Sequence, residues 1–529
     1  MGTVVVHASG RSLAVPPPDR SRLAVMSAHP TSEADVVVVG SGPNGLAAAV
    51  TLARAGLAVH VLEAEDTPGG GARTLDLGLA PGIVHDICSA VHPLALASPF
   101  FAAFDLASRG VRTVAPEASY AQPLDDEPAA IAWHDAERTA EGLGADGPAW
   151  RATLGALARE QDLVVELALG DKRSLPPALR TPRALPVAAR FAALLAMQGT
   201  PAWSLPFRTE RARALLTGVA AHAIGRLPSL ALSGGTAALL ATIAHGEGWP
   251  VPVGGSQSIT EALLADLRAH GGTLTTGHRV RSWRDVPPAT AVLLDTPAPV
   301  AAEILGARLP RSLESMLRRT PRGDAAAKVD FVLSGPVPWR DAEVGRAGTQ
   351  HLGGTREEMA TTEAEVAAGR FPRRPLTLVS DPAVADPSRI RDGLRPLWTY
   401  AHAPQGDPTD PTERITSQIE RFAPGFRDLV VASRAVPAAE MEQHNPALLG
   451  GDISLGRVTM ARMIARPTPL PDPYRLGGTG WYLCSSATPP GPGVHGMSGW
   501  HAARRVLRRE FGIRTMPDLA PALPADPTI

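Results

Sequence analysis

Three glycines near the start of the sequence have the spacing of a phosphate-binding turn: Gly40, Gly42 and Gly45, in a run completed by Ser41, Pro43 and Asn44. In such a loop the first glycine makes the tight turn, the second lets the backbone approach a pyrophosphate, and the third lets the next helix pack on the strand. The free N–H groups and the dipole of that helix favour a bound anion. The loop alone predicts a dinucleotide, and the residues after it indicate which one.

An acidic residue, Glu63, follows this loop at the end of the next predicted strand. A carboxylate at that place accepts both hydrogen bonds of an adenosine ribose and repels a 2′-phosphate. The sequence therefore favours an adenosine without a 2′-phosphate over NADP.

A second glycine cluster, residues 69–71, comes directly after the acid and is followed by Arg73 and Thr74. Gly70 and Gly71 would let the chain pass close to an extended cofactor. Arg73 would meet the pyrophosphate, and Thr74 would reach the flavin end. Because an NAD-only fold has no need of this segment, we predict FAD. The predicted contacts of this region are Glu63, Ala64, Gly70, Gly71, Arg73 and Thr74.

The elements that position these residues form a β-α-β unit: a β-branched strand at 35–39, a helix at 46–55 and a strand at 57–62. Further pieces of the same kind lie far along the chain. They are a helix near 258–270, strands at 273–280, 291–295 and 480–484, and a helix at 495–511. Between them, residues 145–245 are expected to be mainly helical, and residues 325–470 to form strands with turns.

Several stretches resemble the phytoene desaturase-related branch of the FAD-dependent amine oxidase-like superfamily. The resemblance is strongest to the subgroup called pyridine nucleotide-disulfide oxidoreductase domain-containing protein 2, and it covers about residues 34–512. It is carried by the glycine segments above, by residues 81–93, 248–255, 347–355 and 420–426, and by the closing run 489–497.

The resemblance implies where the rest of the cofactor lies. Backbone around Val280 would pass under the adenine, and a C-terminal loop with Ser485, Gly493 and Val494 would hold the flavin. A helix N-terminus near Gly493 would also stabilise the negative charge that gathers on a reduced flavin. Pro492 interrupts the glycine run that carotenoid desaturases have in this loop.

Two histidines, His92 and His495, fall in segments expected to border the flavin, and either could act as an acid or a base. Ordering of a loop by hydrogen bonds is the alternative that we favour for both, because hydride transfer to a flavin needs no protein base. His351, His402 and His444 are expected to be structural.

A metal site at His85, Asp86, Cys88 and His92 is disfavoured, because the set has no zinc-like pairing. Trp339, Trp398 and Tyr400 could line an apolar substrate pocket, with core packing as the default.

The composition excludes some classes of function. A formal net charge of −1 gives no broad electrostatic reason to bind nucleic acid. The two cysteines form no Cys-x-x-Cys, so dithiol chemistry is disfavoured and a reducing, cytoplasmic setting fits best. No apolar run is long enough to span a bilayer. Residues 190–197 could touch a membrane surface, although a covering helix is the favoured alternative.

We therefore expect an α/β plus β fold: a Rossmann-type FAD-binding domain of the FAD/NAD-linked reductase type with an inserted mixed α+β substrate domain. The FAD domain would gather residues 34–100, 245–310 and 470–515, and the substrate domain residues 101–244 and 311–469. Residues 1–33 would be a flexible extension, with Met26 as an alternative start, and 516–529 a tail.

The expected activity is hydride removal from a C–C or C–N bond of an apolar small molecule, with oxygen, a quinone or another acceptor. A flavin-binding scaffold without turnover is the alternative. The sequence leaves the oligomeric state open.

Overall fold

The computed structural model describes residues 4–6, 34–171, 176–229, 233–459, 462, 465–478 and 480–521. Most of the predicted N-terminal extension and the end of the predicted tail lie outside these residues. Residues 4–6 form strand β1 (Val4–Val6), which pairs antiparallel with β16 (Val430–Val436). The expectation of a flexible extension does not account for this short strand.

A five-stranded parallel sheet contains the predicted β-α-β unit. Its order is β10-β3-β2-β11-β17, formed by Thr273–Thr275, Val59–Leu62, Val36–Val39, Ala291–Leu294 and Trp481–Leu483. Numbered by position along the chain, this is the 3-2-1-4-5 order of a doubly wound sheet, in which ligands bind where the strand order reverses, between β2 and β11. The predicted Rossmann-type fold is confirmed.

The two faces of this sheet are covered by different helices. Val36 and Val38 pack in one cluster with α1 (Pro43–Arg54), α11 (Gln257–Ala269) and α19 (Met497–Glu510). Val37 and Val39 pack in another cluster, with α12 (Ala298–Leu305) and α13 (Arg311–Arg318). Because every residue of β2 is buried, its unbroken β-branched run follows from burial on both faces.

A second sheet has eight strands in the order β1-β16-β12-β15-β14-β13-β7-β8. The strands not yet bounded are β12 (Ala325–Leu333), β15 (Arg395–Ala403), β14 (Thr377–Ser380), β13 (Thr349–Leu352), β7 (Ala118–Gln122) and β8 (Ala130–Trp133). α14 (Arg356–Ala367) and α15 (Thr412–Phe422) lie beside it. The chain reaches this sheet from several distant segments, and the predicted domain boundaries remain a prediction.

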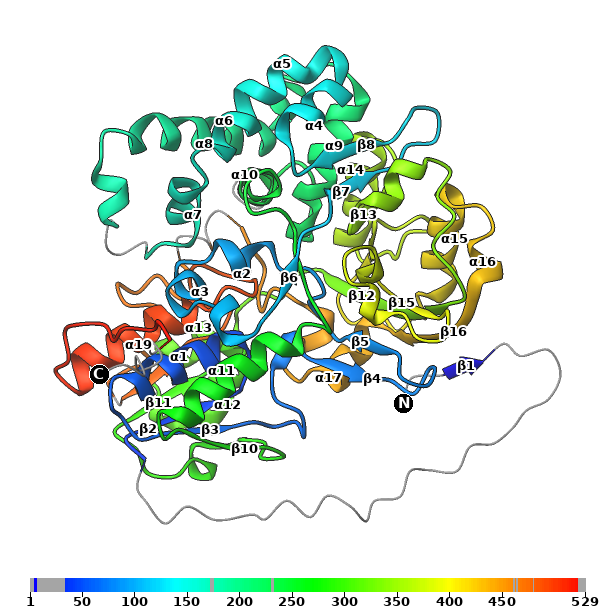
Figure 1. Cartoon of the computed structure of the whole chain (residues 1–529). Helices are drawn as coiled ribbons and strands as arrows, with labels where there is room; N and C mark the ends of the chain where they lie inside the picture. The colour runs from blue at the N-terminus through cyan, green and yellow to red at the C-terminus, as the bar shows by residue number, and fades with distance from the viewer. Residues whose placement is uncertain are drawn as a thin grey trace, which may run out of the picture.

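The stretch predicted to be helical, residues 145–245, forms a layer of helices at the top of the view in Figure 1. Its main members are α4 (Ala136–Gly142), α5 (Gly147–Trp150), α7 (Gln161–Leu169), α8 (Ala184–Gln198), α9 (Glu210–Ala220) and α10 (Ser233–Ala244). Helices α7, α8 and α10 pack against one another, and α10 also contacts α2 (Pro93–Ala97). Residues of α7, α8 and α10 line the same cavity as residues of both sheets.

Candidate cofactor and substrate site

The glycine loop joins β2 to α1 and is shaped by close backbone contacts. Gly40 has a φ of +100°, which side chains rarely adopt. A Cβ on Gly42 would lie 2.5 Å from Asp295 Oδ2, and one on Gly45 would lie 2.3 Å from the Gly40 carbonyl oxygen. No room exists for a side chain at these places, as the dinucleotide loop requires. Pro43 begins the helix, three residues earlier than predicted, because proline suits the first helical position.

Glu63 lies at the carboxyl end of β3, where its carboxylate faces the loop. It accepts hydrogen bonds from the Ser41 backbone N–H (2.8 Å), the Ser41 hydroxyl (2.5 Å) and the Glu65 N–H (2.9 Å). With 7% of its surface exposed, it is a buried acid held by local donors at the edge of a cavity.

The second glycine cluster packs directly on the first. A Cβ on Gly70 would lie 2.9 Å from Gly42 Cα, so the two glycine segments touch. Arg73 donates to the Gly70 carbonyl (3.0 Å) and to the His444 carbonyl (2.8 Å), and borders the cavity. Thr74 donates to Asp86 Oδ1 (2.7 Å).

One cavity of about 1160 Å³ runs along these segments and on to the eight-stranded sheet. Most of the predicted site residues line it: Gly40, Gly42, Pro43, Asn44, Glu63, Ala64, Gly70, Gly71, Arg73, His92, Val280, Gly493 and Val494. Four predicted residues do not border it and lie behind the wall: Gly45, Thr74, Ser485 and His495. The roles assigned to all of them remain predictions.

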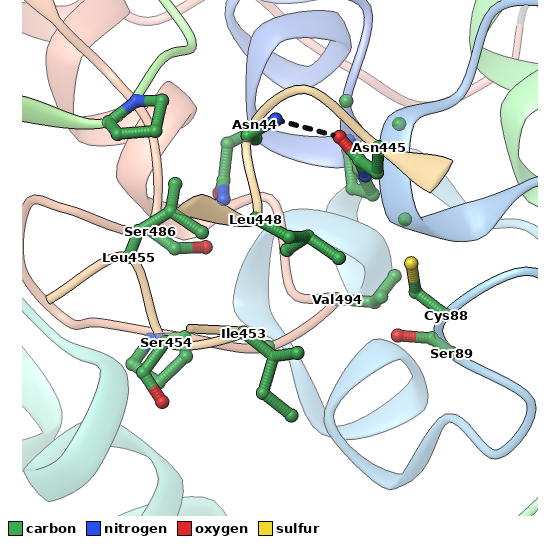
Figure 2. A pocket seen from close by; sticks show the side chains of 18 of the residues that line it. Asn44, Cys88, Ser89, Asn445, Leu448, Ile453, Ser454, Leu455, Ser486 and Val494 are labelled. Carbon is green, nitrogen blue, oxygen red and sulfur yellow. Dashed lines mark hydrogen bonds between the residues drawn. The ribbon is translucent and has the colours of Figure 1, made fainter. Parts of the chain in front are cut away.

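The C-terminal loop borders the same cavity as the glycine segments. Figure 2 shows Val494 and Ser486 of this loop around the same cavity as Asn44 and Cys88. Ser485 donates to the Thr296 carbonyl (2.6 Å), which ties the loop to the end of β11. Helix α19 begins at Met497, two residues later than predicted, because Gly496 adopts a left-handed conformation with φ +67°.

His495 has both ring nitrogens bound to backbone. Its Nδ1 accepts from the Met497 N–H (3.0 Å), and its Nε2 lies 3.1 Å from the Gly491 carbonyl. Burial lowers the pKa of His495 to about 4, so the ring is neutral at physiological pH. This geometry favours the loop-ordering role over a catalytic one.

His92 does border the cavity. Its Nε2 lies 2.7 Å from the Ser256 hydroxyl, which itself donates to the Ser89 carbonyl (2.6 Å). His92 therefore donates through Nε2. Burial lowers its pKa to about 4, which leaves a neutral ring and a weak proton acceptor.

Three residues of the disfavoured metal set, His85, Asp86 and His92, are engaged with other groups of the protein. His85 Nε2 bonds the Phe331 carbonyl (3.1 Å), Asp86 forms an ion pair with Arg389 (3.0 Å), and His92 bonds Ser256. Among the described residues, no group of three or more histidines, cysteines and acids is arranged to hold a metal ion.

The other singled-out histidines also have partners. His351 Nε2 lies 2.8 Å from His222 Nε2, His402 Nδ1 lies 2.6 Å from Glu363, and His444 Nε2 lies 2.8 Å from the Ile87 carbonyl. Each is buried, as expected of a structural histidine.

The far arm of the cavity lies between the helical layer and the eight-stranded sheet. Its helical wall is apolar and includes Leu167, Leu169, Phe191, Leu195, Leu239 and Leu240. The sheet contributes Trp398 and Tyr400 of β15, whereas Trp339 packs in hydrophobic clusters away from it. Residues 190–197 thus form part of the cavity wall in α8, although Leu185 in the first turn of that helix is 75% exposed.

Lys328 of β12 is a charged residue of this arm that the sequence analysis missed. It is 2% exposed, forms an ion pair with Asp330, and donates to the Asp86 carbonyl (3.2 Å). Asp330 stands two residues further along the same strand, so the pair could have been suspected from the alternation of β12.

Asp295 is the second missed residue. It follows β11 at the point where the strand order reverses, and its Oδ2 accepts from the Gly45 N–H (3.0 Å). Burial raises the pKa of this carboxyl to about 7. An acid directly after a buried strand of a parallel sheet was a usable signal, because such ends form ligand sites.

The comparisons with known proteins agree with this architecture. Residues 38–106 match the family model described as an NAD(P)-binding Rossmann-like domain. An uncharacterized protein of Mycobacterium tuberculosis is 27% identical over 536 residues, covering 89% of this chain and 97% of its own.

Two shorter matches lie closer in sequence. Pyridine nucleotide-disulfide oxidoreductase domain-containing protein 2 of Mus musculus is 36% identical over 97 residues, or 18% of this chain and 16% of that protein. Hydroxyneurosporene desaturase of Rhodobacter capsulatus is 61% identical over 44 residues, or 8% and 9%.

Among solved structures, putrescine oxidase bound to putrescine has a TM-score of 0.56 at 19% identity, covering 91% of this chain and 100% of the oxidase. Cyclohexylamine oxidase from Brevibacterium oxydans has a TM-score of 0.53 at 16% identity, covering 90% and 99%. At these identities the likeness establishes the fold.

In its sequence the chain resembles phytoene desaturase-related, FAD-dependent oxidoreductases. FAD fits the residues present, because the two glycine segments leave a backbone cradle without side chains beside a buried acid. Within the described residues, no helix is long and apolar enough to cross a membrane.

Proposed function

We propose that the chain holds FAD along the two glycine segments and uses it to oxidise a largely apolar small molecule at a C–C or C–N bond. The observation that carries this proposal is the continuity of one cavity, which runs from the glycine loop past Val494 to the apolar arm. FAD, when bound, supplies a hydride acceptor at its N5 atom.

The protein's own part is to position the substrate and to exclude water from it. The apolar wall of α7, α8 and α10 would order a substrate by burial of its apolar surface, worth roughly 25 cal/mol per Å² removed from water. Such positioning brings the reacting carbon to the cofactor and can lower the barrier by several kcal/mol.

Proton transfer by the protein has little part in this proposal. The two histidines expected beside the flavin, His92 and His495, are neutral and are held by hydrogen bonds to the protein. This arrangement suits a reaction in which hydride removal is the main event, and it leaves oxygen, a quinone or another molecule to reoxidise the cofactor.

Anaerobic bleaching of the protein-bound flavin tests the proposal. A panel of polyenes, amines and cell extracts is mixed with FAD-loaded protein without oxygen, and loss of the visible flavin absorption is followed. We expect at least one member to bleach the flavin at a saturable rate. Protein that takes up FAD but is reduced by none of them, nor by any other donor, would favour a flavin-binding scaffold without turnover.

A further inference from the structure

The ring of His222 lies where the helical layer meets the eight-stranded sheet. It belongs to a short helical turn, η7 (Ala221–Ala223), which directly follows α9. Its Nε2 lies 2.8 Å from Nε2 of His351 in β13. Its ring also meets the Trp249 ring edge-on, at an interplanar angle of 88° and a centroid distance of 5.4 Å. Two neighbours therefore fix the orientation of this histidine.

The second nitrogen of this ring, Nδ1, faces the cavity that His222 lines. Within the described part of the chain no hydrogen bond reaches this atom, and the protein does not enclose it. Nδ1 of His351, in contrast, is buried without a partner. Gly218 of α9 packs closely on it, since a Cβ there would lie 2.9 Å from that nitrogen. His222 thus offers a ligand a polar atom that no described protein group satisfies.

The bond between the two rings indicates which atoms carry hydrogen. Burial lowers the pKa of both histidines, that of His222 to about 3, so both rings are neutral and one donates while the other accepts. If His351 accepted, its buried Nδ1 would carry a hydrogen without an acceptor. Such an N–H is rarer inside proteins than an acceptor without a donor. His351 therefore donates, and His222 carries its hydrogen on Nδ1, toward the cavity.

Two further polar groups of the same arm have no partner. Thr349 of β13 and Trp398 of β15 lie on one face of the sheet, since Ser380 of β14 pairs with both. Both side chains line the cavity, and neither the Thr349 hydroxyl nor Trp398 Nε1 has a hydrogen-bond partner among the described residues. An indole N–H can only donate, and a hydroxyl can donate. This wall therefore favours a ligand that brings lone pairs.

The arm gives little to a cationic ligand. Among the described residues, α7, α8, α10 and the eight-stranded sheet contribute no aspartate or glutamate to the cavity wall. The charged side chain that they do contribute is Lys328, which is already paired with Asp330. An ammonium group placed here would lose its hydration without gaining a carboxylate, which is costly.

We infer that the far arm binds a neutral, largely apolar molecule that carries a hydroxyl or carbonyl oxygen, and that Nδ1–H of His222 donates a hydrogen bond to this oxygen. His222 is then a specificity-determining residue that takes no part in hydride or proton transfer. The inference deepens the proposed function and rests on it, because it takes the arm as the place of the substrate. A hydrocarbon would leave the N–H unpaired, and burial of an unpaired polar group is unfavourable.

The test compares ligands of one size in FAD-loaded, full-length protein. The ligands are decan-1-ol, decan-2-one, decane and decylamine, the last of which is a cation at neutral pH. Each displaces N-phenyl-1-naphthylamine, a neutral dye that fluoresces in apolar surroundings. We expect His222→Phe to weaken the alcohol and the ketone by about tenfold and to leave decane within about twofold. Decylamine should bind the wild type at least about tenfold more weakly than decan-1-ol.

Two variants control for general damage to the arm. Leu195→Ala shortens an apolar wall residue and should weaken the alcohol and decane alike. His222→Asn can place an amide N–H near the position of Nδ1, and should bring decan-1-ol back to within about threefold of the wild type. Because each ratio compares two ligands in the same protein, a loss of stability does not imitate the result.

An equal loss for decan-1-ol and decane in His222→Phe would overturn the inference, as would decylamine that binds as tightly as the alcohol. A dye that does not bind FAD-loaded protein would also overturn it, because no apolar arm would then be open. Flavin content is measured on the same samples. Protein that takes up no FAD would overturn the proposed function, whereas FAD-loaded protein with the wrong ligand preference would overturn this inference alone.

Discussion

Glu63 has the clearest role at the scale of single residues, since its carboxylate sits beside the loop with three local donors. Glu63→Lys would place a cation against the Ser41 and Glu65 amides and remove the acceptor for a ribose. We expect this variant to lose FAD affinity by at least a hundredfold, since two buried charge-assisted hydrogen bonds are worth about 3 kcal/mol or more. Flavin content after purification and FAD titration measure the effect.

Glu261→Lys is the control for that change, because it makes the same charge reversal on an exposed position of α11. It should keep full flavin content. If Glu63→Lys protein also kept full flavin content while folded, the ribose assignment would be wrong.

His92 tests whether the protein supplies an acid or base. Removal of a general base lowers a reaction rate by about 10²–10⁴-fold. Because His92 is neutral and donates to Ser256, we expect His92→Gln to slow anaerobic flavin reduction by less than about tenfold. Stopped-flow absorbance with a reducing substrate measures this rate. A loss of a hundredfold or more with unchanged substrate affinity would instead make His92 a catalytic base.

Whether a residue of the cofactor site could be predicted depends on how far away in the sequence its partner lies. The glycine loop and Glu63 were predictable, because one β-α-β unit contains the turn, the helix start and the acid. Asp295 could have been suspected from its place after a buried strand, but its bond to Gly45 could not, because the two residues are 250 positions apart. The role of Thr74 beside the flavin stays a prediction. Its hydroxyl donates to Asp86, a contact that spacing along the chain does not reveal.

At the scale of elements, His245 connects two helices and a strand through hydrogen bonds. It follows α10, its Nδ1 lies 2.8 Å from the Trp133 carbonyl at the end of β8, and its Nε2 accepts from the Trp150 indole N–H of α5 (2.9 Å). Burial lowers its pKa from 6.5 to about 4. Since the folded pKa is below the unfolded one, this histidine stabilises the fold above pH 6.5, and that contribution is lost as pH falls from 6.5 to 4.

His245→Gln should flatten the dependence of stability on pH, because a glutamine amide can make both bonds without titrating. The free energy of unfolding of the wild type should fall by up to about 1.4 kcal/mol more per pH unit than that of the variant between pH 6.5 and pH 4. Urea unfolding at several pH values measures both curves. Parallel curves over this range would contradict the assignment of a neutral His245.

Helix α10 forms one wall of the proposed substrate arm, and Gly235 lies on that wall. A Cβ there would lie 3.9 Å from Leu195 Cδ1, which is ordinary contact, so Gly235→Ala should leave the arm open. Gly235→Phe should fill part of it. We expect the Phe variant to keep its FAD and to lose at least about tenfold in substrate affinity or reduction rate, while the Ala variant stays near wild type.

The Ala variant is expected to fold, since glycine is about 1 kcal/mol less favourable than alanine inside a helix. Flavin content and anaerobic reduction, measured side by side, separate damage to the fold from a blocked arm. A Phe variant that turned over substrate as fast as the Ala variant would place the substrate elsewhere.

Single helices and strands were predictable from the sequence, because each is formed by one continuous segment. All five strands of the FAD-domain sheet were predicted, although the strand expected at 273–280 ends at Thr275. The observed starts of two helices differ from the predicted ones, because a single residue determines each start: Pro43 for α1 and Gly496 for α19. The sequence patterns were less informative for the eight-stranded sheet, since a strand pattern does not tell which distant strand is its neighbour.

At the scale of the whole molecule, the chain passes several times between two sheets and a helical layer (Figure 1). Residues of all three line one cavity. That the chain leaves the Rossmann-type sheet and returns to it was predictable, because Rossmann-like segments lie at the start, middle and end of the sequence. The shape of the arm was not, because its walls come from α7, α8, α10, β12 and β15, which meet only in three dimensions.

The central claim is that one cavity holds FAD and brings a substrate to it. The most direct measurement is the visible spectrum of purified protein after reconstitution with FAD, followed by anaerobic addition of substrate candidates. The account predicts one FAD per chain and loss of the oxidised flavin bands with at least one candidate. Protein that stays colourless after reconstitution, while folded by circular dichroism, would contradict the account.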